Sequence, residues 1–397
     1  MTGSDVSAPS ATGSYFWPLF VWGGRIVGLV FVTIVGLIYY HQDKLLYIPN
    51  PPGFPKTPEE NPPGFTSPEE WTTEGKLVRR KGSTSQFQDK IQTEDSFIKT
   101  EDGVSIHTWL LIHEDTEIKH HPVLIYFHGN AGNMGFRLKN AVDMFSKVKI
   151  NILMMDYRGY GKSEGTPTEK GLQNDADAVL KHVTNHPRLK DCPVIVFGRS
   201  LGGAVSFYLA DKYPKLVHGI IVENTFLSIS AMVDILMPYV KPLKNLLLKI
   251  NWRSEEIIAN LAQPMYFISG DADTLVPPSH MKKLYELALK SVHREFFSVL
   301  GGGHNDSWEI AGAEYYIRMR QFVDQYIRKE ATSDIVEKDD SIVNDRKETQ
   351  EPITVAPIEV IQPLTDEEGD GDYFIVENSE GTTRPGIPTM NQNFAVN

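Results

Sequence analysis

The residues with the clearest chemical signature are Gly198-Arg199-Ser200-Leu201-Gly202, a G-x-S-x-G pattern between an apolar segment at 193–197 and a helical segment at 201–212. In a strand–turn–helix of this kind the turn is so tight that a Cβ at either glycine would meet neighbouring backbone, and the serine hydroxyl is held clear of the sheet. The backbone amide of Leu201, at the helix start, would face negative charge developing on a substrate. The pattern predicts a nucleophilic Ser200; the alternative is a structural glycine turn with an incidental serine.

A second set of candidate residues follows another short apolar segment, at 123–127, and reads His128-Gly129-Asn130-Ala131-Gly132-Asn133. A loop in this position can supply a second backbone amide to an oxyanion, and we assign that role to the amide of Asn130. The Asn130 side chain would then be replaceable as long as the loop kept its shape. His128 could be a base, but its place at a strand end before Ser200 favours a hydrogen bond that fixes the loop.

The acid and the base are expected after later strands. Asp271 and Asp273 both follow the apolar segment 265–269, and we favour Asp273 because it lies further into the loop and can reach a histidine. His304 follows three glycines, which would let the backbone bring its imidazole over the serine. Asp306 is a second possible partner for His304, although two residues along the same loop is awkward geometry.

Ser200, Asp273 and His304 in this order predict acyl transfer. His304 would take the proton of Ser200, and Ser200 would attack an ester, thioester or amide carbonyl. Amides of Leu201 and Asn130 would hold the oxyanion, and water would hydrolyse the acyl-enzyme. This chemistry requires no metal and no organic cofactor.

The elements that must position these residues are read from the hydrophobic pattern between residues 96 and 330. Short apolar runs typical of buried strands alternate with amphipathic stretches typical of helices. The strands are expected at 106–112, 123–127, 150–155, 194–197, 219–222, 265–269 and 296–299, and the helices at 168–183, 201–212, 280–289 and 313–327. Such alternation predicts an α/β fold with a mostly parallel sheet covered by helices on both faces.

The N-terminal part of the chain predicts a membrane anchor. Residues 15–40 are almost wholly apolar and are interrupted only by Arg25, and about 20 such residues span a bilayer. A polar stretch without a small-x-small cleavage pattern follows, which favours an uncleaved signal-anchor over a signal peptide. Arg25 on the N-terminal flank favours a cytoplasmic N-terminus and a single-pass type II topology. The predicted divisions are a tail at 1–18, the anchor at 19–41, a proline-rich stalk at 42–95, the catalytic domain at 96–330 and a disordered acidic tail at 331–397.

Charge and cysteine content exclude several classes of function. The chain carries a formal charge of −12, and residues 331–397 hold 15 acidic against 4 basic residues, so the remainder is nearly neutral. A nearly neutral domain with no basic stripe and an acidic tail gives no reason to expect nucleic-acid binding. The single cysteine, Cys192, excludes an internal disulfide framework and is read as a small residue at the edge of the core.

Three further patterns are weaker signals. Gly161-Lys162-Ser163 resembles the end of a phosphate-binding loop, but the glycine that the pattern requires at position 156 is Asp156, so Lys162 is read as solvated. The acidic segment 366–372 lacks the ligand spacing of an EF-hand. Asn305 begins the only N-glycosylation sequon and is the glycosylation candidate, although its place beside the proposed base would crowd a glycan.

Together these motifs resemble a known family, the membrane-anchored α/β hydrolases of the bud-emergence type. The resemblance runs from the anchor to about residue 330 and is carried by KLLYIP at 44–49, HGNAGN at 128–133, DYRGYGKSEG at 156–165, GRSLGG at 198–203 and GGGHND at 301–306. It implies the α/β-hydrolase fold, a single-pass protein, and Ser200, Asp273 and His304 as the charge-relay residues. The acidic tail falls outside what the resemblance covers.

The apolar character of a lid-like insertion at about 226–260 favours a lipid-like or acylated substrate. A thioesterase acting on acylated proteins is a variant of this hypothesis, and a peptidase of the same fold is an alternative, because fold does not fix substrate. A hypothesis of another class is a non-catalytic membrane scaffold whose acidic tail recruits protein partners of unknown identity.

Overall fold

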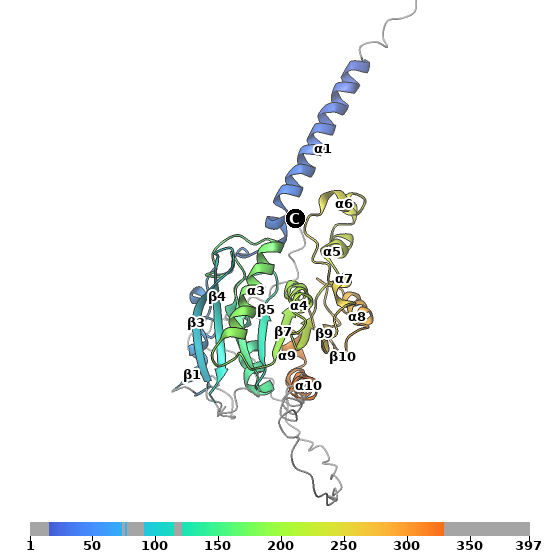
Figure 1. The fold of residues 1–397 in the computed structure, drawn as a ribbon. Coiled ribbons are helices and arrows are strands. Elements are labelled where there is room, and N and C mark those ends of the chain that lie inside the picture. The colour runs from blue at the N-terminus through green and yellow to red at the C-terminus, as the bar shows by residue number, and fades with distance from the viewer. Residues whose placement is uncertain (1–15, 74–75, 78–90, 115–120, 329–397) are drawn as a thin grey trace, which may run out of the picture.

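The computed structural model describes residues 16–73, 76–77, 91–114 and 121–328, so the predicted acidic tail and its segment 366–372 lie outside it. Its main element is an eight-stranded sheet in the order β10-β9-β8-β7-β5-β6-β4-β3 (Figure 1). The strands are β3 (Ile91–Lys99), β4 (Ser105–His113), β5 (Val123–Phe127), β6 (Asn151–Met155), β7 (Val194–Arg199), β8 (Gly219–Glu223), β9 (Met265–Gly270) and β10 (Arg294–Val299).

The six strands from β5 to β10 pair in parallel, and β4 pairs antiparallel with both β3 and β6. The seven predicted strands are all present within two residues of their expected ends, because parallel strands buried on both faces are almost continuously apolar. β3 was not predicted and begins inside the stretch assigned to the stalk. Six of the nine residues in its sequence, IQTEDSFIK, are polar, because an edge strand leaves part of its surface to solvent.

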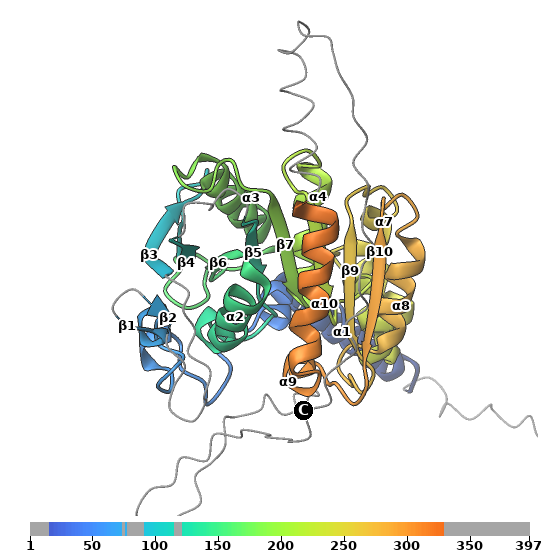
Figure 2. The same ribbon diagram turned by 90° about the horizontal axis from the view of Figure 1, so that it is seen from below.

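Helices cover both faces of the sheet, as predicted. One face carries α3 (Glu169–Asn185), α4 (Leu201–Lys212), α7 (Ser254–Ile258) and α8 (Pro278–Leu287), which share one buried apolar cluster. The other carries α2 (Leu138–Met144), α10 (Ala313–Val323) and π-helical turns at Phe145–Lys149 and Asp324–Arg328, which share a second cluster (Figure 2). Two apolar layers on one sheet give the domain a core on each side.

The N-terminal segment forms α1 (Phe16–Leu46), which extends away from the domain (Figure 1). By length and composition α1 can span a membrane from Val21 onward, and it continues five residues past the expected end of the anchor. The following residues lie on the domain and contain 3-10 turns at Pro58–Glu60 and Pro68–Trp71, then the short pair β1 (Thr72–Thr73) and β2 (Lys76–Leu77). This segment contacts the loop after β5, where the amide groups of Asn61 and Asn133 exchange two hydrogen bonds at 2.8 and 3.1 Å.

The lid lies between β8 and β9. It contains α5 (Ile229–Leu236), a 3-10 turn (Pro238–Leu243), α6 (Lys244–Leu247) and then α7. α6 lies beside the C-terminal end of α1 (Figure 1). The hydrogen bonds between the two segments are described under the further inference.

Candidate active site

Ser200 occupies a strained turn between β7 and α4. Its φ of 55° and ψ of −119° lie in a region that L-residues other than glycine rarely adopt. A Cβ on Gly198 would lie 2.1 Å from the Gly202 carbonyl oxygen, and a Cβ on Gly202 would lie 2.0 Å from the carbonyl oxygen of Phe127. Backbone on both sides therefore requires glycine at the two positions that the pattern identified.

Strand β8 and the residues after it hold this turn in place. The Ser200 amide donates to the Glu223 carbonyl at 3.0 Å, and the Thr225 hydroxyl donates to the Ser200 carbonyl at 2.7 Å. Beneath the turn, Arg199 forms a fully buried ion pair with Glu223 at 2.9 Å. A conformation that is costly in isolation is thus fixed by several surrounding contacts.

The loops after β9 and β10 bring Asp273 and His304 together. Asp273 Oδ2 lies 2.7 Å from His304 Nδ1, and both side chains are buried. The other carboxylate oxygen, Oδ1, accepts hydrogen bonds from the amides of Leu275 and Val276 at 2.8 and 2.9 Å. With both oxygens bound, the Asp273 carboxylate is held in one orientation toward the imidazole.

The other two aspartates fix backbone. Asp271 is exposed and accepts a hydrogen bond from the Gly301 amide at 2.6 Å, and Asp306 accepts one from the Gly303 amide at 2.6 Å. They therefore shape the glycine loop from its two ends while Asp273 contacts the ring of His304.

Asn224, which sequence reasoning did not identify, links the three loops of the site. Its backbone has a positive φ of 48°, and its amide group donates to the carbonyls of Gly303 and His304 at 2.9 and 3.1 Å. Its Oδ1 accepts from the Gly270 amide at 2.8 Å. A polar residue directly after the buried strand β8 was the available signal, because such residues meet at the carboxyl edge of a parallel sheet.

The loop after β5 lies directly beside the nucleophile. A Cβ on Gly129 would lie 3.7 Å from Ser200 Cβ. The Asn130 side chain donates to the Leu46 carbonyl at the end of α1, and its Oδ1 and carbonyl oxygens both accept from the Tyr160 hydroxyl at 2.9 Å. The Asn130 side chain thus helps to set the shape of this loop, and the sequence had suggested that it was replaceable.

His128 is fully buried, and its Nδ1–H donates to the Gly129 carbonyl, 2.6 Å away. Its Nε2 lies 3.6 Å from Asp156. Burial lowers the pKa of His128 to about 4, so the ring is neutral at pH 7. This arrangement matches the loop-fixing hydrogen bond that the sequence favoured.

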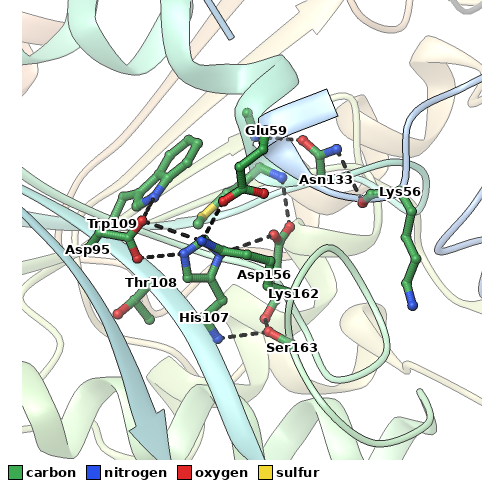
Figure 3. Close-up of polar contacts among 12 residues, drawn as sticks. Lys56, Glu59, Asp95, His107, Thr108, Trp109, Asn133, Asp156, Lys162 and Ser163 are labelled. Atoms are coloured by element: carbon green, nitrogen blue, oxygen red, sulfur yellow. Dashed lines mark hydrogen bonds and ion pairs between the residues drawn. The ribbon is translucent and has the colours of Figure 1, made fainter. Parts of the chain in front are cut away.

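A polar network, buried at Asp156 and His107 and open to solvent at Glu59, supports the same loop from the edge of the sheet (Figure 3). Asp156 accepts from the Met134 amide at 2.7 Å, and His107 Nε2 lies 2.8 Å from Asp95. Lys162 pairs with Glu59 of the segment after α1 at 2.7 Å and with Asp95 at 3.5 Å. The expectation of a solvated Lys162 was therefore wrong, because acidic groups from two distant segments meet at its ammonium group.

The glycosylation candidate Asn305 is partly exposed, but the serine of its sequon is enclosed. Ser307 is fully buried, and its hydroxyl lies 3.1 Å from the Gly303 carbonyl and 3.2 Å from the Asn224 amide group. In the folded domain, therefore, a glycan would have to leave directly from the loop of the proposed base.

The strand order explains why these residues meet. The chain passes from β5 outward to β6 and then returns to β7 on the other side of β5. The order in which strands are added to the sheet therefore reverses between β5 and β7, although the two strands are parallel. Open α/β sheets bind ligands outside the carboxyl ends of the strands at such a point. Ser200 follows β7 and Gly129 follows β5, which places them on either side of it.

The sequence is similar to proteins from plants and yeasts. It is 34% identical over 334 residues to alpha/beta hydrolase domain-containing protein WAV2 of Arabidopsis thaliana, covering 80% of this chain and 99% of the relative. It is 33% identical to protein bem46 of Schizosaccharomyces pombe, covering 70% and 85%. A Saccharomyces cerevisiae relative described as a membrane protein, YNL320W, is 35% identical and covers 53% and 75%.

Residues 118–255 match the family described as serine aminopeptidase, S33, a stretch that includes Ser200 and ends before Asp273 and His304. Among solved structures, an esterase of Pyrococcus furiosus, Pf2001, is similar with a TM-score of 0.50 and 20% identity, covering 60% of this chain and 92% of its own. At that identity the likeness concerns the fold, and it confirms the predicted α/β-hydrolase fold.

Proposed function

The chain belongs to the family of α/β hydrolases that includes WAV2 and bem46, and on this premise we propose that it is a membrane-anchored serine hydrolase that cleaves acyl esters or thioesters. The observation that carries the proposal is the contact of His304 Nδ1 with Asp273 Oδ2 at 2.7 Å. Ser200 and His304 are held by consecutive residues after β8, because the Thr225 hydroxyl donates to the Ser200 carbonyl at 2.7 Å and the Asn224 amide group donates to the His304 carbonyl at 3.1 Å. An imidazole oriented in this way presents its other nitrogen as a base.

In the proposed reaction, His304 Nε2 takes the proton of Ser200 as the serine oxygen attacks the acyl carbonyl carbon. The tetrahedral intermediate collapses, and the leaving alcohol or thiol departs with the proton from His304. Water then attacks the acyl-enzyme, giving one proton to His304, which returns it to Ser200 as the carboxylic acid leaves. The Asp273 carboxylate stabilises the imidazolium.

The oxyanion is assigned to the backbone amides of Leu201 and Asn130. Leu201 is the first residue of α4, where amides lack partners within the helix and the helix dipole is positive. Gly129, the residue before Asn130, lies next to Ser200, which supports this pairing of donors. A donor of this kind accelerates the reaction by about 100- to 1,000-fold.

The anchor is proposed to be α1, with the N-terminus in the cytoplasm and the domain in a lumen or outside the cell. The apolar window of α1 has no buried residues and a mean hydropathy of 2.1, which is the composition of a span in lipid. The Saccharomyces cerevisiae relative is described as a membrane protein, which supports a membrane location for this chain.

The proposed function is tested in cells that overexpress the full chain or its Ser200→Ala variant. We expect the wild type to lower the level of a lipid ester or of acylated proteins, and the variant to leave both unchanged. Lipid extracts and acyl-protein profiles that are identical for the two would contradict the proposal.

A second candidate function is that of a peptidase, because the family that matches residues 118–255 carries the description serine aminopeptidase. An amide is harder to cleave than a thioester because the amine is a poorer leaving group. Aminoacyl p-nitroanilides and acyl thioesters of matched acyl groups separate the two candidates, and we expect turnover of the thioester.

A further inference from the structure

The lid exposes a continuous apolar stretch at its end. Ile235, Leu236, Met237 and Tyr239, here called the lid tip, are 44%, 52%, 41% and 94% exposed. They end α5 and enter the following 3-10 turn. Exposed apolar stretches of this kind mark a surface that contacts lipid or another protein.

The lid is fixed to the end of α1. The buried Gln42 side chain donates to the Leu247 carbonyl and accepts from the Lys249 amide at 2.9 Å. The ammonium group of Lys249 also lies 2.7 Å from Asp43. These three contacts join the last turns of α1 to the end of α6 and the residues that follow it.

A fourth contact joins the lid to the residue that follows α1. The indole of Trp252 donates to the hydroxyl of Tyr47 at 2.9 Å, and both side chains are buried in the core under the lid. The lid therefore has a fixed height along α1, set by residues 42–47. A segment held in this way moves with the anchor.

The apolar part of α1 ends just above that height. α1 has 31 residues and a length of about 46 Å, whereas a bilayer core needs about 20 residues. The first polar turn after the apolar stretch is residues 41–44, which are the residues that bind the lid. Tyr40 is 74% exposed at this level, as expected for a residue at the bilayer interface.

The lid tip lies on the side of the domain from which α1 extends. In Figure 1, α5 and α6 lie beside the end of α1. α10 lies at the other end of the domain, which is the end that faces the viewer in Figure 2. Lys44 and Lys241, both exposed, add positive charge suited to lipid headgroups around the tip.

We propose that the lid tip inserts into the leaflet from which α1 emerges, so that the acyl chain of a substrate enters the site from the membrane. This inference rests on the proposed function in two respects, namely that α1 spans the bilayer and that the site cleaves acyl substrates. The partner is a lipid surface rather than a protein, because the contacts of residues 42–47 with Lys249 and Trp252 hold the end of the lid at the level where the apolar part of α1 ends. Within the lid, Lys244 of α6 pairs at 2.6 Å with Asp234, the residue before the tip.

The test uses a single fluorophore in the full chain. Cys192 is the only cysteine and is buried, so a Cys192→Ala background leaves no competing thiol. Leu236→Cys, Val30→Cys and Ile317→Cys are each labelled with NBD and reconstituted in phosphatidylcholine vesicles. The replaced residues are 52%, 51% and 55% exposed, respectively. The three fluorophores report the surroundings of the lid tip, of α1 and of α10.

We expect doxyl-labelled lipids to quench the fluorophores at 236 and 30 and to leave the one at 317 unquenched. Quenching at 30 without quenching at 236 would overturn the inference and leave the anchor in place. A blue shift at 236 without lipid quenching would assign the tip to a protein surface or to a second copy of the chain, which also overturns it. Loss of quenching at both 30 and 236 would refute the anchor and the inference together.

A functional readout complements the fluorescence. The Leu236→Gln/Met237→Gln variant changes exposed side chains, so we expect it to fold. Hydrolysis of an ester carried by a long-chain lipid in vesicles should fall about tenfold, because the variant tip partitions less well into lipid. Hydrolysis of p-nitrophenyl acetate in solution should stay unchanged. Equal rates for both proteins on the vesicle substrate would contradict lateral entry of the acyl chain.

Discussion

His304 Nδ1 and Asp273 Oδ2 lie 2.7 Å apart although the two residues are 31 positions apart in the chain. Their loops meet because β9 and β10 are neighbours in the sheet and end at the same edge. The carboxylate is held by two backbone amides, so it cannot turn away from the imidazole. Asp273 contacts the ring of His304, whereas the carboxylates of Asp271 and Asp306 accept from the backbone amides of Gly301 and Gly303.

We therefore expect Asp273→Asn to lower kcat by about ten-thousand-fold, because an amide can stabilise the wrong tautomer of His304 and cannot stabilise the imidazolium. The measurement is hydrolysis of p-nitrophenyl acetate by the purified full chain. Asp271→Asn is the matched control, since Asp271 is exposed and its carboxylate accepts from the backbone amide of Gly301. A loss for Asp271→Asn as large as that for Asp273→Asn would contradict the assignment.

The side chain of Asn130 should matter through the shape of its loop. Asn130→Ala removes the contacts to Leu46 and Tyr160, and we expect kcat to fall about tenfold as the proposed oxyanion amide loses its position. Tyr160→Phe removes only the hydroxyl and should have a smaller effect in the same direction. Wild-type kcat in Asn130→Ala would show that the loop keeps its shape without the side chain.

The two glycines of the serine turn should not tolerate a methyl group. In Gly202→Ala the new Cβ would lie 2.0 Å from the Phe127 carbonyl oxygen, and backbone has to move to relieve the clash. We expect a loss of about 3 kcal/mol or more in the free energy of unfolding, measured by denaturant melts. Gly129→Ala is the comparison, because its Cβ would meet only ordinary contacts at 3.7 Å. Similar melts for the two variants would contradict the steric account.

The stability of the domain should fall in mild acid because of His128. Burial lowers the pKa of His128 from 6.5 to about 4, so the unfolded chain binds a proton that the folded chain does not bind. The free energy of unfolding should therefore drop as the pH falls from about 6.5 to about 4, by up to about 3 kcal/mol from this group.

His128→Asn isolates that contribution. The neighbouring charges of Asp156 and Arg137, which also act on His128, remain in the variant, as do the other buried histidines. Unfolding is followed at pH 4.5 and pH 7 for both proteins. We expect a smaller difference between the two pH values in His128→Asn, and an unchanged difference would show that His128 is protonated in the folded state.

The sequence was sufficient for the parts of the fold that depend on local pattern. The strand β7, the turn at Ser200 and the helix α4 were predictable because buried apolar strands and a glycine-bounded serine leave a local signature. The choice of Asp273 over Asp271 was also predictable, since it depends only on reach beyond the end of β9.

The parts that were not predictable depend on contacts between distant segments. Asn224 acts through carbonyls some 80 residues later, and Leu46 at the end of α1 contacts Asn130 across 84 residues. Lys162 looked solvated because neither Glu59 nor Asp95 is near it in the sequence. Local composition carries no information about such pairings, and the edge strand β3 was missed because its outer face is polar.

The central claim is that Ser200 is an activated nucleophile, and a fluorophosphonate probe tests it most directly. The purified full chain and its Ser200→Ala variant are incubated with the probe, and both are shown to be folded by their thermal melts. The account predicts covalent labelling of the wild type and none of the variant. No labelling of folded wild type would contradict the account and would favour a domain that acts as a membrane scaffold.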